Sequence, residues 1–398
     1  MNRDDLAPDS SRAWDAREVL MVDPSLFTAP YNAALSSGLE AEGVRVLWAT
    51  RDLRSGEEDE LGVTRRMPFF YPLSDGARRR TGGPWRVVKG IEHALGLRKL
   101  AQVARRHAFD VVHYQWALVP ALDARAIARL RRERPVVLTV HDTTPFNGKN
   151  VSRAQRDGFG MVLRAVDRLI VHTVRGREML VEDGIDPARI AVVPHGLLSG
   201  NAAPTKARPG DRWRVVQFGK IQGYKGVDVL IEALGVMSAA DRARLSVIVA
   251  GEPMMDMASL IERAAVLGLN PGTIEFRLRR HSQAEMNAVL SEADAFVFPY
   301  RVIEASGVLL LVASANRWII ASDLGSFSEL VGTDDGAGTL VPPGDAKSLA
   351  AALVASIGRR PTRSAGVAVP SWETIGAMTC AVYRDAMAAW TRDRALAA

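Results

Sequence analysis

Two lysines lie on a glycine-bearing loop in the second half of the chain. An apolar run ends at Gly219, the loop carries Lys220 and Lys225, and a helical pattern begins between Gly226 and Asp228. Ammonium groups attract phosphate oxygens, and so do the N–H groups at a helix N-terminus. The loop therefore predicts a diphosphate site. The alternative is an ordinary surface loop with two solvated lysines.

A second loop whose residues could take part in binding or catalysis follows another apolar run, which ends at Pro299. This loop carries Glu304, Ser306 and Gly307, and an apolar helical segment comes after it. Glycine allows a ligand to approach the backbone closely, and the helix N-terminus again favours an anion. The Glu304 carboxylate is suited to accept hydrogen bonds from sugar hydroxyls. As an alternative, Glu304 caps the helix.

Metal-binding patterns are absent from the sequence. No Asp-x-Asp motif ends an apolar run, and the acidic residues 57–60 lie in a polar stretch typical of a solvated loop. The single cysteine, Cys380, excludes an intramolecular disulfide and a thiolate cluster. Five histidines show no common ligand spacing: His107, His113, His172, His195 and His281. We expect no divalent metal, and we interpret these histidines as structural, except His195 at the expected end of a strand.

The elements that position these loops follow a strand-and-helix alternation. Short β-branched runs alternate with longer segments of helical periodicity, which is typical of a parallel α/β sheet. Strands are predicted at 19–22, 44–49, 111–115, 136–140, 168–171 and 190–193, and then at 214–218, 246–250, 274–278, 295–298, 318–321 and 339–341. Residues 199–210, which are small, polar and proline-containing, indicate a linker. We predict two doubly wound halves whose ligands bind at the carboxyl ends of the strands.

Composition and charge narrow the class of protein. The chain has 398 residues, of which 47% are hydrophobic and 24% are charged, as expected for two globular domains and not for a disordered or fibrous protein. The first eighteen residues lack the apolar segment of a secretory signal, and no apolar run is long enough to span a bilayer. Together with the lone cysteine, this predicts a cytoplasmic protein.

The net charge of +6 is concentrated in one segment, residues 78–107. Nine basic residues and one acid, Glu92, lie between Arg78 and His107, and Trp85 heads a stretch with helical spacing. Such a helix could lie on an anionic membrane surface, which predicts a peripheral position on the inner face of the cell membrane. The alternative is a core-packed helix with a solvated basic face. Nucleic acid is not expected, because no binding motif or aromatic platform is present.

Three motifs in succession resemble the retaining glycosyltransferases of family 4, which have the GT-B fold. They are Gly-Lys-x4-Lys-Gly at 219–226, Phe-Pro-Tyr-x3-Glu-x-Ser-Gly-Val at 298–308 and Ile-Ile-Ala-Ser-Asp-Leu-Gly-x3-Glu-Leu-Val at 319–331. The resemblance covers residues 212–385 and is looser before them. It implies two Rossmann-like domains facing across a cleft: an acceptor-side domain at 1–204, a nucleotide-sugar domain at 205–372, and a C-terminal helix at 373–398 that crosses back to the first domain.

The resemblance also implies roles for individual residues. His141, Glu304 and Lys225 would be catalytic. The donor, a sugar on a nucleotide diphosphate such as UDP or GDP, would contact a set that shares the three motifs: Gly219, Lys220, Lys225, Ser306, Gly307, Val308 and Glu329. No metal or other cofactor is implied. For His141 the alternative is a loop histidine that caps a strand end together with Asp142.

Two departures from the family pattern bear on the site. The second signature glutamate, expected to hold the ribose hydroxyls, is replaced by Val312. The glycine-rich loop after the first strand is replaced by residues 27–32, in which Tyr31 and Asn32 are candidates for the acceptor side. These departures leave the nucleotide and the acceptor contacts open.

The resulting hypothesis is a metal-independent, retaining hexosyltransferase. It would move a hexose from a nucleotide diphosphate sugar to a saccharide or lipid-linked saccharide acceptor, in polysaccharide or glycoconjugate synthesis. Two alternatives remain open from the sequence. One is a GT-B sugar-nucleotide epimerase, and the other is a catalytically inactive GT-B partner protein, which the Val312 departure favours.

Overall fold

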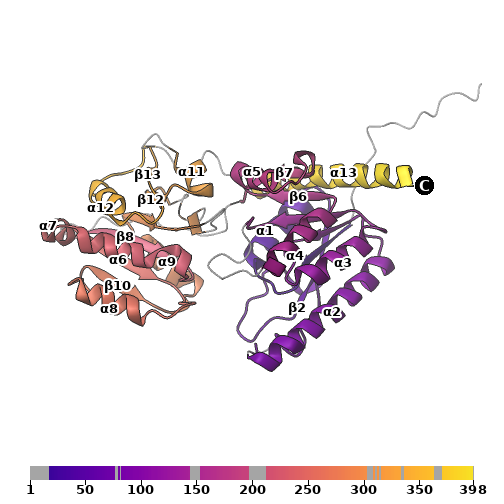
Figure 1. Cartoon of the computed structure of the whole chain (residues 1–398), viewed down its shortest axis with the longest axis horizontal. Coiled ribbons are helices and arrows are strands. Elements are labelled where there is room, and N and C mark those ends of the chain that lie inside the picture. Colours follow the sequence, from indigo (N-terminus) through magenta and orange to yellow (C-terminus); the bar gives the residue numbers. More distant parts are fainter. Residues whose placement is uncertain are drawn as a thin grey trace, which may run out of the picture.

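The computed structural model contains two parallel β-sheets, each flanked by helices, in two lobes (Figure 1). It describes residues 18–76, 79–80, 82–143, 153–196, 212–302, 308–309, 312, 315–332, 336–362 and 370–397. Parallel neighbours cannot be joined by tight turns, so each strand is followed by a crossover helix or loop. The two-lobed α/β fold predicted from the sequence is confirmed.

The first lobe holds a 7-stranded sheet in the order β3-β2-β1-β4-β5-β6-β7. Its strands are β1 (Glu18–Asp23), β2 (Arg45–Arg51), β3 (Arg66–Phe70), β4 (Val111–Tyr114), β5 (Val136–Val140), β6 (Arg168–Val171) and β7 (Ile190–Val192). Its α-helices are α1 (Ala29–Ala41), α2 (Gly83–Arg106), α3 (Pro120–Leu130), α4 (Arg153–Ala165) and α5 (Val174–Glu182). Short 3-10 turns, Val63–Arg65 and Pro187–Arg189, precede β3 and β7.

The second lobe repeats this plan with a 6-stranded sheet in the order β10-β9-β8-β11-β12-β13. The strands are β8 (Trp213–Phe218), β9 (Leu245–Ala250), β10 (Ile274–Arg277), β11 (Ala295–Phe298), β12 (Trp318–Ser322) and β13 (Gly338–Val341). The helices are α6 (Val227–Val236), α7 (Ala239–Ala243), α8 (Ala258–Val266), α9 (Gln283–Ser291), α11 (Gly325–Val331) and α12 (Ala346–Ala355). A 3-10 turn, Gly223–Lys225, precedes α6.

The side chains of β1 show how each sheet divides two apolar layers. Leu20 and Val22 pack with α2, α3 and α4, whereas Val19 and Met21 pack on the opposite face with α1 and the last helix. Successive side chains of a strand point to opposite faces, so a strand buried on both sides is a continuous apolar run. The pattern that predicted the strands therefore follows directly from their double burial.

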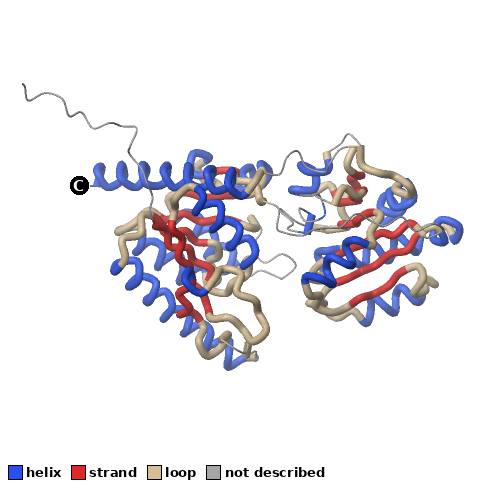
Figure 2. The backbone as a smooth tube through the Cα atoms, turned by 180° about the vertical axis from the view of Figure 1, so that it is seen from behind, coloured by secondary structure: helices blue, strands red, loops and turns tan. Residues whose placement is uncertain are grey.

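The last helix, α13 (Trp372–Ala397), belongs to the first lobe although it follows the second in sequence (Figure 2). It packs along α1, and two glycines make the contact possible. A Cβ on Gly38 would lie 2.0 Å from the Trp372 carbonyl oxygen, and one on Gly376 would lie 2.2 Å from the Gly38 carbonyl oxygen. The two backbones thus touch where any larger residue would separate them.

The predicted strands are observed with ends shifted by a residue or two, but β3 was missed. Pro68 interrupts its apolar run and cannot donate a ladder hydrogen bond. The strand is tolerated because it forms the edge of the sheet, where its pairing with β2 is irregular at Thr50/Arg51. The linker predicted at 199–210 lies entirely outside the described residues. The domain boundaries stay a prediction.

Candidate active site

Both sheets reverse their strand order beside the first strand of the lobe, between β1 and β4 and between β8 and β11. Loops diverge at such a point, and ligands of doubly wound sheets bind there, outside the carboxyl ends of the strands. In the second lobe the loop after β8 carries Gly219, Lys220 and Lys225, and the loop after β11 begins at Pro299. The two sequence motifs therefore lie on either side of one switch point.

Lys225 is a buried cation at the switch point of the second lobe. Its side chain is 7% exposed, and its ammonium lies 5.3 Å from the centre of the Tyr300 ring. Gly219 has φ +115°, and a Cβ there would lie 2.9 Å from Lys225 Nζ. Gln217 donates its amide N–H to the Lys225 carbonyl oxygen at 2.8 Å. Burial lowers the pKa of Lys225 from its usual value, as expected for an ammonium that lacks water around it.

Lys220, in contrast, is exposed, so the two lysines of the motif differ in environment. The chain enters α6 through Gly226, whose φ is +66°. A Cβ at Gly226 would lie 1.8 Å from the carbonyl oxygen of Pro299. The loops after β8 and β11 are therefore in direct backbone contact, and glycine is required at their crossing.

A salt bridge also ties the two loops together. Arg301 Nη1 lies 2.7 Å from Asp228 Oδ1, in the first turn of α6, and the Arg301 backbone N–H donates to the Tyr224 carbonyl oxygen at 2.8 Å. Asp228 occupies the helix end that favours negative charge, and Arg301 neutralises it. Asp228 therefore neutralises part of the positive potential at the α6 N-terminus, and an anion bound in the loop would neutralise more of it.

Glu304, Ser306 and Gly307 lie outside the described residues. Val308 is half-buried, and its Cγ2 lies 3.1 Å from the position of a Cβ on Gly219. Val312, which replaces the second signature glutamate, is fully buried in an apolar cluster that includes Phe327. The position is therefore part of the core in this protein.

His141 lies at the carboxyl end of β5 in the first lobe. Its ring stacks on Trp116, with centroids 5.0 Å apart, and meets Tyr31 edge-on at the same distance. Its Nε2 lies 2.9 Å from Gln115 Oε1, and its Nδ1 lies 3.1 Å from His172 Nε2. Burial lowers the pKa of His141 well below its usual value, and the neighbouring histidines add to the shift. The imidazole is therefore neutral near pH 7.

Two further histidines join this group: His172, which the sequence left as structural, and His195, which it singled out. His172 follows β6, His195 follows β7, and both rings contact Tyr31. Burial lowers the pKa of His172 to about 4 and that of His195 to about 3. The sequence did contain a signal for this group, because each histidine follows one of three neighbouring strands, β5, β6 and β7. The structure places His195 in this cluster, and its role stays a prediction.

The candidates for the acceptor side are buried. Tyr31 is enclosed by the histidine cluster and by Trp372 of α13, at a centroid distance of 5.3 Å. Asn32 is buried and donates its amide N–H to Asp23 Oδ2 at 2.9 Å. Both side chains therefore shape the base of the site, and neither extends from its surface.

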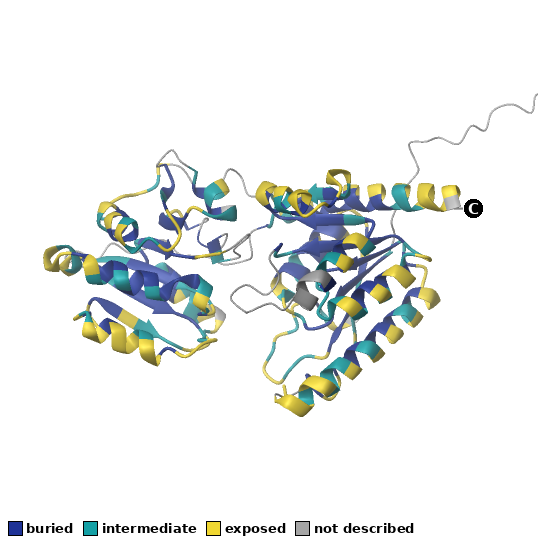
Figure 3. Ribbon diagram, in the orientation of Figure 1, coloured by how far each residue is buried: buried dark blue, intermediate teal, exposed yellow. Residues whose placement is uncertain are grey.

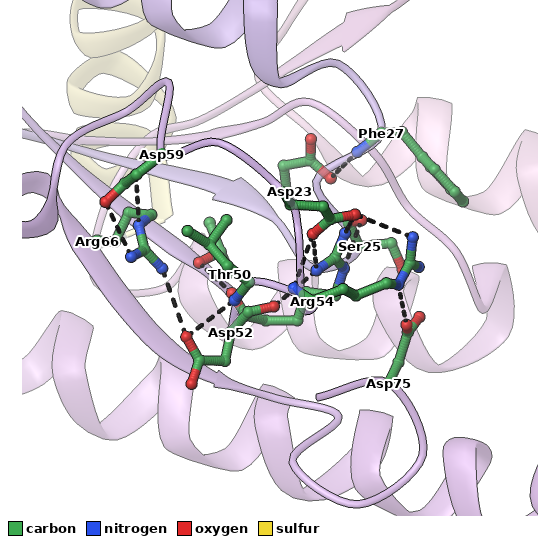
Figure 4. Close-up of polar contacts among 12 residues, drawn as sticks. Asp23, Ser25, Phe27, Thr50, Asp52, Arg54, Asp59, Arg66 and Asp75 are labelled. Carbon is green, nitrogen blue, oxygen red and sulfur yellow. Dashed lines mark hydrogen bonds and ion pairs between the residues drawn. The ribbon is translucent and has the colours of Figure 1, made fainter. Parts of the chain in front are cut away.

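A charged network surrounds the carboxyl ends of β1 and β2 and the loop that leads into β3 (Figure 4). Arg51, which is almost fully buried, makes two hydrogen bonds to the Glu57 carboxylate, at 2.7 and 2.9 Å. Asp59 pairs with Arg66 at 2.9 Å. The interpretation of residues 57–60 as a solvated acidic loop was therefore wrong for these two carboxylates. Their partners, Arg51 and Arg66, lie outside the acidic run, so the run by itself did not indicate that these two carboxylates are paired.

Contacts between the lobes involve residues near both loops. The Asp142 carboxylate, next to His141, is close enough to Tyr224 to contribute to the raised pKa of that phenol, although burial is the larger cause. Glu329 Oε1 accepts a hydrogen bond at 3.4 Å from the backbone N–H of Arg175, at the N-terminus of α5. Burial raises the pKa of Glu329. The residue predicted to bind the donor thus contacts the other lobe in this structure.

Among the described residues, no group of three or more His, Cys, Asp or Glu side chains is arranged to hold a metal ion. Within the same ranges, no helix combines the length and the apolar character that a membrane span needs.

Comparisons with known proteins agree with this architecture. The family model "Glycosyltransferase Family 4" matches residues 29–197, and "Glycosyl transferases group 1" matches residues 212–358. Together the two models span most of the chain, which identifies it as a family 4-like glycosyltransferase. Each model matches one lobe. The first half, where the resemblance was looser, therefore also matches a glycosyltransferase family.

Named glycosyltransferases are similar over most of their length. A D-inositol 3-phosphate glycosyltransferase of Kineococcus radiotolerans is 28% identical over 368 residues, which is 77% of this chain and 79% of that protein. A phosphatidyl-myo-inositol mannosyltransferase of Mycobacterium leprae is 29% identical over 296 residues, covering 69% of this chain and 73% of that protein.

Solved structures share the fold at low identity. Sucrose-phosphate synthase from Thermosynechococcus elongatus has a TM-score of 0.65 at 16% identity, covering 96% of this chain and 98% of that one. Anabaena HepE in complex with UDP and glucose has a TM-score of 0.62 at 16% identity, covering 92% and 97%. The GT-B glycosyltransferase fold expected from the motifs is confirmed.

Proposed function

We propose that this glycosyltransferase moves a hexose, with retention of anomeric configuration, from a nucleotide diphosphate sugar to a saccharide or lipid-linked saccharide. The observation that carries the proposal is the buried ammonium of Lys225, held over Gly219 at the N-terminus of α6. A buried cation with a lowered pKa gains most when an anion arrives, because a neighbouring negative charge restores the protonated form.

The leaving diphosphate supplies that anion. Lys225, Lys220 and the N–H groups around Gly219 would hold it, and negative charge that develops on the leaving oxygen would be stabilised by groups already in place. Removal of one such group at other active sites costs about 3–4 kcal/mol of transition-state stabilisation. The positive charge comes from lysine and helix, so the proposed reaction uses no metal ion.

Retention would follow if the acceptor hydroxyl attacks from the face that the diphosphate leaves. A phosphate oxygen then takes the hydroxyl proton while the sugar passes to the acceptor oxygen, and no carboxylate nucleophile is needed. The family resemblance assigns His141 and Glu304 to the donor sugar, and Ser306, Gly307, Val308 and Glu329 to the rest of the donor site.

UDP or GDP is the proposed nucleotide. The solved structure of Anabaena HepE contains UDP and glucose, and the similar mannosyltransferases take their name from the sugar that they transfer. The names of the similar inositol enzymes support a hydroxyl-bearing acceptor that carries a phosphate or a lipid. Val312 leaves the ribose without the usual carboxylate, so the base and ribose contacts must differ from the family pattern.

An anionic membrane surface is the proposed location of a lipid-linked acceptor, and α2 is the contact. Val87, Ile91 and Leu95 follow one face of this helix at four-residue spacing and are 66%, 58% and 53% exposed (Figure 3). Exposed basic residues on α2, Arg86, Arg98, Lys99, Arg105 and Arg106, flank the stripe. Of the basic residues predicted to take part, Arg78 lies outside the described residues.

Thermal unfolding with a nucleotide panel tests the donor site. UDP, GDP, ADP and dTDP and their sugars are added to the wild type and to Lys225→Met, which removes the charge but keeps much of the side-chain length. A ligand at a hundred times its Kd stabilises the fold by about 2.7 kcal/mol. We expect one nucleotide to stabilise the wild type and none to stabilise the variant. Lys347→Met, on α12, is the control.

Transfer is then assayed with the sugar of that nucleotide, by release of the free diphosphate and by the anomeric configuration of the product. Inversion would contradict the retaining mechanism. Stabilisation without turnover on any saccharide or lipid-linked acceptor would favour an inactive binding protein. Equal stabilisation of the wild type and Lys225→Met would remove Lys225 from the donor site.

A further inference from the structure

The histidine cluster contains a chain of hydrogen bonds whose direction is fixed at one end. His172 Nδ1 lies 3.0 Å from the carbonyl oxygen of Val193. A carbonyl oxygen only accepts, so Nδ1 of His172 must carry the hydrogen and donate it. A neutral imidazole has one N–H, which leaves Nε2 of His172 with a lone pair. His172 is neutral near pH 7, since burial lowers its pKa to about 4.

The lone pair of His172 determines the state of His141. The two rings meet at His172 Nε2 and His141 Nδ1, 3.1 Å apart. Because His172 can only accept at this atom, His141 must donate from Nδ1. A neutral His141 then has its lone pair on Nε2. This is the less populated tautomer of a free imidazole, so the surroundings must impose it.

Gln115 completes the chain when its amide N–H₂ group faces His141. In the structure Gln115 Oε1 lies 2.9 Å from His141 Nε2, and Gln115 Nε2 lies 3.3 Å from His113 Nε2. A half-turn of the amide exchanges its oxygen and nitrogen at these positions. With N–H₂ toward His141, the amide oxygen faces His113, whose Nε2 must then carry hydrogen, as its 2.8 Å contact with Thr139 Oγ1 also allows. His113 Nδ1 is left to accept from the Tyr383 hydroxyl at 2.8 Å. Each ring has one hydrogen, and every bond joins a donor to an acceptor.

The opposite assignment fails at His172. If Gln115 presented its oxygen, His141 would donate from Nε2 and accept at Nδ1. His172 would then donate from both nitrogens and carry a positive charge. The groups packed around it are Tyr31, His141 and His195, and none of them is an anion. A buried cation without a counter-charge is costly, so the neutral chain is the stable one.

We propose that His172 is a positioning residue that fixes His141 as the Nδ1–H tautomer. His141 therefore presents a hydrogen-bond acceptor, Nε2, to its surroundings. Resting on the proposed function, this means that His141 receives a hydrogen bond from a substrate hydroxyl, which takes the place of the Gln115 amide. Ammonium or hydroxyl groups suit this nitrogen, whereas a carbonyl or phosphate oxygen does not.

Nitrogen NMR of the ligand-free protein tests the tautomer without any need for activity. Histidine labelled with nitrogen-15 gives distinct signals for protonated and unprotonated ring nitrogens, and single substitutions assign them. We expect Nδ1–H for His141 and His172 and Nε2–H for His113 near neutral pH. A His141 that carries hydrogen on Nε2, or a His172 protonated on both nitrogens, would overturn the proposal.

Three variants show which residue sets the tautomer. His172→Phe removes the acceptor, so we expect the His141 signals to change to Nε2–H. His195→Phe, at a neighbouring ring that makes no bond to His141, should leave Nδ1–H in place. Gln115→Leu should also leave it, whereas a change to Nε2–H there would assign control to Gln115 and contradict the proposal. If His172→Phe does not fold, the wild-type spectrum and the other two variants still decide the question.

Kinetics separates this inference from the proposed function. If the chain transfers sugar, His172→Phe should raise KM for the substrate whose hydroxyl binds His141, or lower kcat, while His107→Phe, at an exposed histidine outside the cluster, should change neither. The NMR result stands even if no transferase activity is found. Conversely, if the protein is active but His141 carries its hydrogen on Nε2, the proposed function stands and only the role of His172 is removed.

Discussion

The Nδ1 atom of His113 lies 2.8 Å from the hydroxyl oxygen of Tyr383, although 270 residues separate them in the chain. His113 is in β4 of the first lobe, and Tyr383 is in α13, which follows the whole of the second lobe. This bond, together with the ring contact between Trp372 and Tyr31, places the C-terminal helix beneath the histidine cluster. The helix that ends the chain is therefore part of the base of the candidate site.

The packing of α13 on α1 should be sensitive to a single methyl group. Gly376→Ala places a Cβ 2.2 Å from the Gly38 carbonyl oxygen, so the helices must separate. We expect a loss of about 1–3 kcal/mol in the free energy of unfolding, measured with urea. Gly90→Ala, in α2, has no atom within 4 Å of the new Cβ and should stabilise the protein by about 0.5–1 kcal/mol. Equal effects of the two variants would contradict the close helix contact.

Stability should fall on acidification before the carboxylates titrate. Burial lowers the pKa of His113 and His195 to about 3 and that of His172 to about 4, below the usual 6.5. Below that value the unfolded chain binds protons that the folded protein does not, so unfolding becomes easier as the pH falls. Each histidine contributes up to about 1.4 kcal/mol per pH unit, until the folded pKa is reached.

Urea unfolding between about pH 7 and pH 5 measures this slope. His195→Phe keeps a ring in the cluster but removes one titrating group, so its stability should depend less on pH than that of the wild type. A stability that is constant over this range, or a variant slope equal to that of the wild type, would show that the histidines are not buried in the neutral form.

Restoring the signature glutamate should damage the fold. Val312 is fully buried among apolar side chains, so Val312→Glu places a carboxylate without a partner in the core. We expect a loss of about 3–5 kcal/mol in the free energy of unfolding. Val302→Glu, at a 43% exposed position in the loop that follows β11, should change stability by no more than about 0.5 kcal/mol. A Val312→Glu protein as stable as the wild type would show that position 312 is open to solvent or ligand.

Membrane binding through α2 should depend on its apolar stripe and on anionic lipid. Ile91→Gln removes an exposed apolar side chain from the centre of the stripe, and we expect about tenfold weaker cosedimentation with phosphatidylglycerol vesicles. Val266→Gln, at a 71% exposed residue of α8 in the other lobe, is the matched control. No binding by the wild type, or equal binding to vesicles of phosphatidylcholine alone, would count against the proposed surface.

The fold was predictable because its strands are buried on both faces. A run such as 136–140 is apolar at every position but Thr139, and all five residues are buried in β5. The same signal fails for β3, an edge strand that contains Pro68 and is only partly buried. A strand that is buried on both faces needs apolar residues at nearly every position, so it is easily recognised in the sequence. An edge strand has no such requirement and depends mainly on the strand with which it pairs.

The loop after β8 was predictable for a different reason. Gly219, Lys225 and Gly226 stand close together in the chain, and their types suit a tight loop and an anion. What the sequence did not indicate is that Lys225 is buried beneath Tyr300 while Lys220 is exposed. Two lysines of one motif look alike in sequence, and only the packing around them distinguishes their environments.

The sequence by itself determined the two α/β lobes, the family and the loops that could hold a diphosphate, because these depend on local patterns and on residues near one another in the chain. Only the tertiary structure decided that His141, His172 and His195 form one cluster and that Tyr383 reaches it from the last helix. Parallel strands bring their carboxyl ends to one edge of a sheet, so side chains far apart in the chain meet there. Their protonation depends on that meeting, which no single segment of the sequence contains.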